Sequence, residues 1–160
     1  MGGPIFPYSA YPVTAGNVFP NIHVGAGANS KHEEGLGVAA SIAADSIWRM
    51  RVQLPPELPS GTCKLVLRAL ANATSGAAKV NAKWASVANG EDPSSAALQA
   101  EGTTTLTWAA GDADKYKQTS IVLDADTPVA GEVLVIDLVF ETTGWTLAQV
   151  STWAVFVIWE

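Results

Sequence analysis

The sequence closes with Thr152-Trp-Ala-Val-Phe-Val-Ile-Trp-Glu160, a run that places seven apolar residues in a row. A run rich in β-branched and aromatic residues predicts a strand, and it lacks the polar last turn and cap of a helix. Alternation gives the strand two faces, Trp153, Val155, Val157 and Trp159 on one and Ala154, Phe156 and Ile158 on the other. Because both faces are apolar, we expect both to be covered. One should face the domain's own core, and the other a second sheet segment, an arm or another chain.

Further strands are expected upstream of this run. The apolar alternation is clearest where Trp48, Met50 and Val52 face away from Arg49 and Arg51. Similar patterns, separated by turns rich in Gly, Pro and Asn, predict strands over residues 18–24, 36–44, 46–54, 62–71, 77–88, 103–108, 118–125 and 132–141. Residues 25–37 are expected to be a loop, and 94–117 a long connection with a helical turn near 96–99.

This spacing of short strands, with turn signals every 8–12 residues, is typical of an antiparallel β-sandwich or barrel. With about eight core strands and a long crossover at 94–117, we predict a jelly-roll β-sandwich over residues 18–160. The remaining residues, 1–17, combine Pro4, Pro7 and Pro12 with Ile5, Phe6, Tyr8 and Tyr11. The prolines exclude a helix and favour an extended arm. The arm could dock on a neighbouring subunit, run as a strand along its own domain, or stay a disordered leader.

The composition excludes several classes of function. Charged residues make up 15% of the chain, against roughly 25% in typical soluble domains, which favours burial in an assembly. The net charge of −6 and the lack of a Lys/Arg cluster argue against a nucleic-acid partner. No apolar run is long enough to span a membrane, and residues 1–8 lack the features of a signal peptide. We therefore expect a protein made and kept soluble in a cytoplasm.

No pattern in the sequence singles out a catalytic or metal centre. His23 and His32, the latter in Lys31-His-Glu-Glu34, do not have the spacing of a zinc motif, and we interpret the segment as a solvated loop. Asp112-Ala-Asp114 and Asp124-Ala-Asp126 could bridge loops through calcium, but turn residues that bond the backbone are the simpler interpretation. Cys63, the single cysteine, is expected to be packed rather than nucleophilic. The prediction is a non-enzymatic protein without a cofactor.

The six tryptophans suggest either packing or ligand binding. Trp48 and Trp84 alternate with apolar neighbours and are expected in the core. Trp108, Trp145, Trp153 and Trp159 are less constrained, and exposed aromatic residues would suit a sugar-binding platform or an oligomer interface.

Several motifs in residues 45–160 together resemble a recurrent family of small β-sandwich proteins of tailed-phage virions. These motifs are Asp45-Ser-Ile-Trp48, Val52-Gln-Leu-Pro55, Ser60-Gly61, Ala73-Thr-Ser-Gly76, Trp84, Gly90-Glu-Asp92 and Ala130-Gly-Glu132 leading into Leu134-Val-Ile-Asp-Leu138. The resemblance implies a structural particle component, such as a head decoration protein or an accessory piece of the tail or neck. It supplies no catalytic residues.

The first hypothesis is a capsid decoration protein on the virion surface, made in the host cytoplasm, that forms a homo-oligomer, most simply a trimer, and binds the major capsid protein. Its interface is expected to use Ile5, Phe6, Tyr8, Tyr11, Trp153, Val155 and Trp159. The alternative is a carbohydrate- or receptor-binding sandwich of a phage tail or secreted enzyme, using Trp108 or Trp145 on loops. A cupin-like enzyme is the weakest reading, because it would need a His-rich metal centre.

Overall fold

The computed structural model describes residues 8–12, 18–24, 32–38, 42–149 and 151–160, with the backbone alone before Gly37. The described residues form ten strands and no helix. The strands are β1 (Tyr8–Pro12), β2 (Val18–Val24), β3 (His32–Val38), β4 (Ser46–Gln53), β5 (Cys63–Ala71), β6 (Gly76–Val87), β7 (Gln99–Trp108), β8 (Lys115–Val122), β9 (Val133–Phe140) and β10 (Ser151–Trp159).

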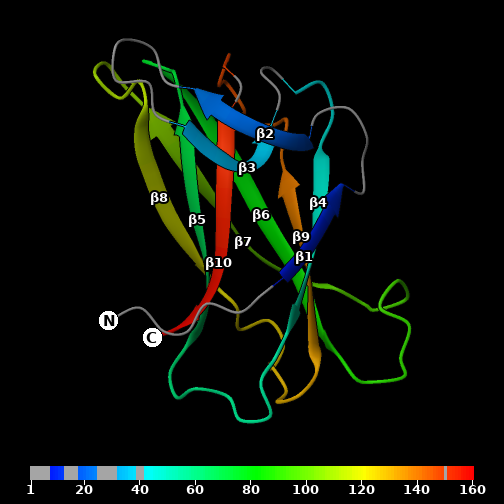
Figure 1. The fold of residues 1–160 in the computed structure, drawn as a ribbon. Coiled ribbons are helices and arrows are strands. Elements are labelled where there is room, and N and C mark those ends of the chain that lie inside the picture. Colours follow the sequence, from blue (N-terminus) through cyan, green and yellow to red (C-terminus); the bar gives the residue numbers. More distant parts are fainter. Residues whose placement is uncertain (1–7, 13–17, 25–31, 39–41, 150) are drawn as a thin grey trace.

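The strands form two five-stranded antiparallel sheets that face each other (Figure 1). Sheet A has the order β1-β4-β9-β6-β7, and sheet B has the order β2-β3-β10-β5-β8. Within them, β3 pairs with β10, β4 with β9, β5 with β8 and β6 with β7, and these nested pairs alternate between the sheets. This is one long antiparallel hairpin wound into a sandwich, the arrangement of a jelly roll. The predicted fold class is confirmed: eight strands make the jelly roll, and β1 and β2 extend it at the edges.

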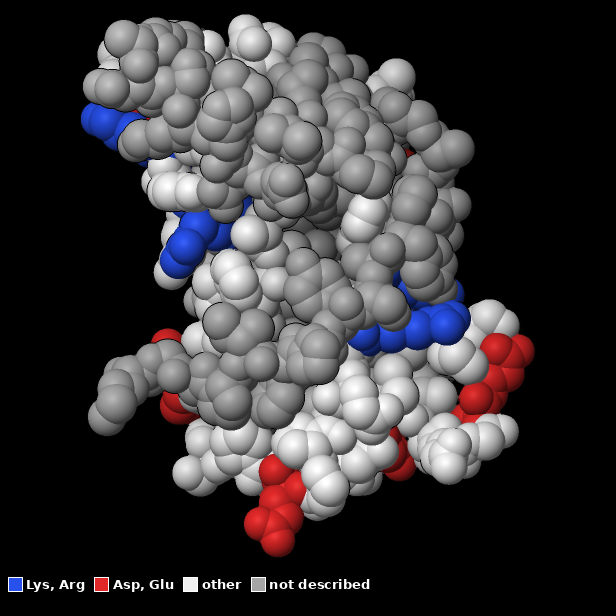
Figure 2. Space-filling view, in the orientation of Figure 1, with Lys and Arg blue, Asp and Glu red and all other residues white. Residues whose placement is uncertain are grey.

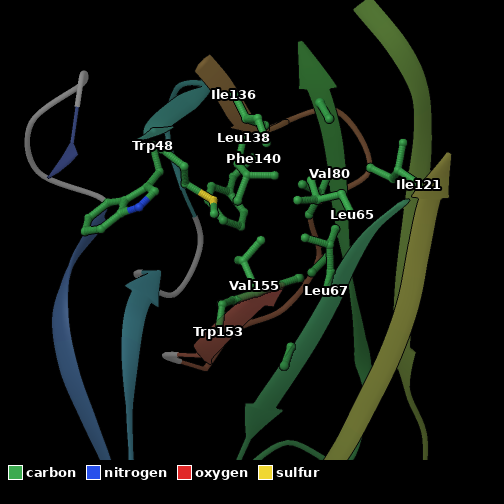
Figure 3. Close-up of a cluster of buried hydrophobic side chains, with 14 of the residues drawn as sticks. Trp48, Leu65, Leu67, Val80, Ile121, Ile136, Leu138, Phe140, Trp153 and Val155 are labelled. Carbon is green, nitrogen blue, oxygen red and sulfur yellow. The ribbon is translucent and has the colours of Figure 1, made fainter. Parts of the chain in front are cut away.

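The core lies between the sheets and follows the alternation read from the sequence. In β4 and β5 every second side chain is buried, and Trp153, Val155, Val157 and Trp159 of β10 complete the layer from sheet B. Figure 3 shows Trp153 and Val155 of this layer in the same cluster as Val80 of β6 and Phe140 of β9. Phe140 packs edge-on against Trp145 and Trp153, with ring centroids 6.0 and 5.3 Å apart. Aromatic pairs of this kind add about 0.5–1.5 kcal/mol each beyond the burial of their area.

Some predicted elements are wrong in position. The segment 32–34, expected in a loop, opens β3, and that strand ends at Val38 rather than continuing to residue 44. In the connection expected over 94–117, the predicted strand 103–108 is present but begins earlier, as β7; the start of β8 also lies there, and the segment contains no helical turn. The polarity of this edge strand explains the error: Thr103, Thr105 and Thr107 are exposed in β7, and only its end has buried apolar residues, so most of it lacks the apolar alternation that marks a half-buried strand.

The segment predicted as an arm contributes a strand to its own domain. β1 pairs antiparallel with β4 over its whole length, with Tyr8 opposite Val52 and Pro12 opposite Trp48. Residues 1–7 and 13–17 lie outside the described part of the chain. Of the alternatives open for the arm, the structure shows the strand along its own sheet for Tyr8–Pro12.

Three loops meet at the lower end of the sandwich in Figure 1: residues 54–62, 88–98 and 123–132. Leu54 donates its backbone N–H to the carbonyl of Glu132 at 2.9 Å, and Gly131 donates to Pro55 at 2.8 Å, which joins two of these loops. The C-terminal residue is fixed at the same end by a pair of backbone hydrogen bonds between Glu160 and Thr62. The described residues include no helix long and apolar enough to cross a membrane.

Candidate functional site

The outer face of sheet B brings aromatic, basic and polar side chains together on β5, β8 and β10. In β5 the residues Cys63, Leu65 and Leu67 point to the core, so Lys64, Val66 and Arg68 lie on the outside. Strand register then places three rows across the face: Ala154, Arg68 and Gln118; Phe156, Val66 and Ser120; and Ile158, Lys64 and Val122. We call these residues, together with Tyr116, the β5-β8-β10 face.

Arg68 is held in the middle of this face by two aromatic rings. Its guanidinium carbon lies 5.5 Å from the ring centroid of Tyr116 and 5.7 Å from that of Phe156, within the range of a cation–π contact. Its Nε and Nη2 both donate to Oε1 of Gln118, at 3.3 and 3.2 Å. These contacts fix a flexible side chain in one orientation, so the face presents a preorganised guanidinium between two ring surfaces.

A shallow groove of about 400 Å³ runs beside Arg68. Its lining combines apolar, hydroxyl, amide and charged groups, and consists of Lys64, Val66, Gln118, Thr119, Ser120, Ile158 and Glu160. At the far end Lys64 is ion-paired with Glu160 at 2.9 Å. The distance along β5 from Arg68 to Lys64 is about 13 Å at the usual rise per residue, long enough for an extended ligand.

Among the residues whose exposure the structure describes, this face carries the most exposed large apolar residues on a strand. Tyr116 is 49% exposed and Val122 is 39% exposed, and both project outward from β8. The third exposed large apolar residue described, Val129, lies in the loop 123–132. An exposed apolar group beside fixed polar groups is the usual composition of a binding surface.

The outer face of sheet A has two basic side chains that are ion-paired with carboxylates. Arg49 donates through Nε and Nη2 to both carboxylate oxygens of Asp137, at 2.6 and 2.7 Å, and Asp137 is only 6% exposed. Lys79 pairs with Glu141 at 2.7 Å. These bridges join β4 to β9 and the end of β9 to β6.

The lower end of the sandwich holds a second hollow of about 410 Å³, bordered by Leu58, Pro59, Pro128 and Trp159. Trp159, the aromatic residue that borders this hollow, is only 6% exposed. Each of the three loops at this end carries acidic residues and none carries Lys or Arg, and Figure 2 shows the acidic side chains gathered there, below the basic ones. With little aromatic surface open to a ligand, this hollow is the weaker candidate site.

The predicted interface residues of β10 lie elsewhere than expected. Trp153, Val155 and Trp159 are 1%, 4% and 6% exposed and belong to the hydrophobic core, so their assignment to a subunit interface is wrong. The error is one of face: Ala154, Phe156 and Ile158 are the half-buried residues on the outside of the strand. Ile5 and Phe6, and the side chains of Tyr8 and Tyr11, lie outside the described part of the structure, so their role stays a prediction.

The tryptophans are packing residues. Trp48 and Trp84 are buried as predicted, but Trp108 and Trp145, expected on loops as sugar platforms, are also buried, at 2% and 8% exposure. Trp108 ends β7 on the same face as Leu106, and the indole of Trp145 donates to the carbonyl of Leu147 at 3.1 Å. Neither ring offers a surface to a ligand.

The remaining candidates for chemistry have structural roles. Burial raises the pKa of the Cys63 thiol to about 12, which keeps it protonated, as expected for a packed residue. Asp112 accepts the backbone N–H of Ala109 at 2.8 Å, and Asp126 that of Thr127 at 2.8 Å, as the turn interpretation predicted. Within the described residues no group of three or more His, Cys, Asp or Glu lies together as a metal site. The side chains of His23 and His32 are outside the described part.

Sequence reasoning missed Arg68, Gln118 and Tyr116. The alternation of 64–68 and 116–122 was available and predicts which residues face outward. These residues come together because β5 pairs with both β8 and β10, and no pattern within one strand predicts which strands it pairs with.

Comparisons with known proteins leave the family open. No protein-family model matches the sequence, and no curated protein matches it. Among solved structures, the chain is similar to TmCBM61 in complex with β-1,4-galactotriose, at 13% identity and a TM-score of 0.46, over 99% of this chain and 92% of that one.

Two further solved structures show the same level of likeness. A family 11 carbohydrate-binding module from Clostridium thermocellum in complex with a β-1,3-1,4-mixed-linked tetrasaccharide has 12% identity and a TM-score of 0.47, over 94% and 87% of the two chains. The K1 cleaved adhesin domain of Lys-gingipain from Porphyromonas gingivalis has 14% identity and a TM-score of 0.48, over 94% and 89%. Function is therefore inferred from the side chains of this chain.

Proposed function

We propose that the chain is a non-catalytic carbohydrate-binding domain whose ligand lies across the β5-β8-β10 face. The observation that carries the proposal is the arrangement of Tyr116, Arg68 and Phe156 beside a groove lined with amide and hydroxyl groups. A sugar ring has an apolar face of C–H groups and a rim of hydroxyls. The exposed ring of Tyr116 suits the first, and Gln118 and Ser120 suit the second.

The groups of this face suit binding better than catalysis. A glycosidase needs two carboxylates that flank the scissile bond, about 5–10 Å apart. The groove contains one carboxylate, Glu160, and that group is ion-paired with Lys64. Hydrogen bonding to Lys64 and the charge of that residue lower the pKa of Glu160, which is opposite to the raised pKa of a general acid.

The test is a glycan array probed with the wild-type domain and two variants. Tyr116→Ala removes the most exposed ring of the face and should weaken binding to every recognised glycan at least about tenfold, or about 1.4 kcal/mol. Val129→Ala removes an exposed apolar side chain in the loop 123–132 and should leave binding unchanged. Because Tyr116 is half exposed, its loss should not unfold the domain, and circular dichroism of each variant checks this. A wild-type domain that binds no glycan contradicts the proposal.

A second candidate function, a self-associating subunit of a phage particle, is favoured by the apolar content of the same face. Val66, Val122, Phe156 and Ile158 are exposed or half-buried there, and a neighbouring copy could cover them. We infer from it a homotrimer that binds a capsid surface. Light scattering during size exclusion tests it against the 16.7 kDa protomer: a stable trimer that Phe156→Ala dissociates supports this function, and a monomer contradicts it.

A further inference from the structure

We propose that Arg68 makes this face selective for carbohydrates that carry a carboxylate, such as oligosaccharides of uronic acids. The inference rests on the proposed carbohydrate function and adds the class of sugar and the residue that recognises it.

The basic side chains of the domain differ in their partners. Four of the described cations each hold a carboxylate within 2.9 Å, in the pairs Arg49–Asp137, Lys64–Glu160, Lys79–Glu141 and Lys117–Asp112. Arg68 instead hydrogen-bonds the neutral amide of Gln118, at distances of 3.2 and 3.3 Å. Its charge is therefore fixed in place on the outer face of the sheet, and among the side chains that the structure describes no carboxylate is ion-paired with it.

The guanidinium of Arg68 has N–H donors that Gln118 does not use. A guanidinium has five N–H donors in one plane, and a carboxylate bound by two of them in parallel is a strong and directional arrangement. Nε and Nη2 of Arg68 each give a donor to Gln118, which leaves donors on Nη1 and a second one on Nη2. The rings of Tyr116 and Phe156 keep that plane from turning, so a ligand carboxylate would meet a prepared site.

The charges at the two ends of the groove favour one direction for an acidic ligand. The acidic loops lie at the lower end of the sandwich, where Lys64 is already neutralised by Glu160. Arg68 lies four residues further along β5, away from that end. A sugar carboxylate at Arg68 would therefore be separated from the acidic loops, whereas one at the Lys64 end would be repelled. The polar tract of Gln118 and Ser120 would then bind the neutral rings between the two ends.

The experiment compares oligogalacturonate and oligoguluronate with their fully methyl-esterified forms, which have the same sugar rings without the charge. Binding is measured by isothermal titration at two salt concentrations. For at least one of the two sugars the wild-type domain should bind the free acid at least about tenfold more tightly than the ester, because charge-assisted hydrogen bonds are worth more than neutral ones.

The variant Arg68→Gln should remove this difference, so that acid and ester bind equally and at the affinity of the ester. Arg68→Lys keeps the charge but loses the planar donor pair, and should restore only part of the preference. Lys83→Gln is the matched control, because it removes the same charge from an exposed residue on the outer face of sheet A.

The outcomes separate the two proposals. If the wild-type domain binds neutral glycans but shows no preference for either acid over its ester, the inference is wrong and the carbohydrate function stands. A preference that Arg68→Gln leaves intact, or that Lys83→Gln removes as well, also overturns it. If the domain binds no carbohydrate, acidic or neutral, both proposals fail.

Discussion

Replacing Glu101 by alanine should destabilise the domain by removing the three hydrogen bonds that its side chain accepts. Oε1 of Glu101, on β7, accepts the indole N–H of Trp84 at 2.6 Å and the backbone N–H groups of Asp124 and Ala125 at 2.8 Å each. Trp84 is fully buried, with 0% exposure. The single carboxylate oxygen therefore joins strand β6 and the loop after β8 to the edge strand β7.

The magnitude follows from what each donor can do after the substitution. The indole N–H of Trp84 would be left buried without a partner, which costs about 1–3 kcal/mol. The two backbone donors are exposed and can bond water, so together they add about 1 kcal/mol. We expect a total loss of about 2–4 kcal/mol, which lowers the melting temperature of a domain this size by roughly 5–15 °C.

A double-mutant cycle isolates the bond. Glu101→Ala is measured by urea unfolding in the wild type and in Trp84→Phe, where the indole donor no longer exists. In the Trp84→Phe protein, Glu101→Ala should cost only the hydrogen bonds to the backbone of Asp124 and Ala125. The coupling energy between the two positions should therefore be about 1–3 kcal/mol. Glu101→Gln retains the acceptor oxygen and should cost about 1 kcal/mol or less.

The reasoning is refuted if Glu101→Ala costs the same in both backgrounds within about 0.5 kcal/mol, the usual error of additivity. It is also refuted if Glu101→Gln is as damaging as Glu101→Ala, since the charge rather than the acceptor would then carry the stability.

Three further predictions concern other parts of the domain. Cys63, whose pKa burial raises to about 12, should not react with iodoacetamide at pH 8 in the folded domain but should react at once in urea; equal rates would contradict its burial. Asp45 accepts hydrogen bonds from the hydroxyl and the backbone N–H of Thr142, and these lower its pKa. The folded state then binds this proton less readily than the unfolded state, so the stabilisation is present above about pH 4 and is lost as the pH falls through the lowered folded value. The urea concentration at the unfolding midpoint should therefore decrease as the pH is lowered below 4, and it should decrease less steeply in Thr142→Val. Identical pH profiles of the two proteins would count against this hydrogen bond. Gly61→Ala should destabilise by at least about 1 kcal/mol in the same assay, because Gly61 has φ +117° and a Cβ there would lie 2.6 Å from the carbonyl oxygen of Glu160; an unchanged midpoint would show that the turn relaxes.

The core was predictable because its signal is local. Alternation within 46–54 and 62–71 identified the inward residues of β4 and β5, and it separated the two faces of β10 correctly. Both faces of β10 are apolar, so composition did not decide which of them meets the core. For this reason the assignment of Trp153 and Trp159 to an interface was wrong. The phase of Trp108 relative to Leu106 could have placed it in the core, but β7 was too polar to be recognised as a long strand.

The jelly roll was predicted correctly on a partly wrong ground. The segment 94–117 is not a long crossover, because the strand predicted at 103–108 is longer than expected and β8 begins within the segment at Lys115. The fold comes from the nested pairing of the first core strand, β3, with the last, β10, and of each later strand with its counterpart. Such pairing is a property of contacts between distant segments. For the same reason the proximity of Arg68 to Tyr116 and Phe156 required the structure.

The central claim is that carbohydrate binds across the outer face of sheet B, and residue-resolved NMR titration tests it most directly. The ligand is the oligosaccharide that the array or titration identifies, added to isotope-labelled domain. We expect chemical-shift changes that follow β5, β8 and β10, strongest at Arg68, Tyr116 and Phe156, with sheet A unaffected. Changes confined to the loops 54–62, 88–98 and 123–132 would contradict it and would move the site to the acidic end of the sandwich.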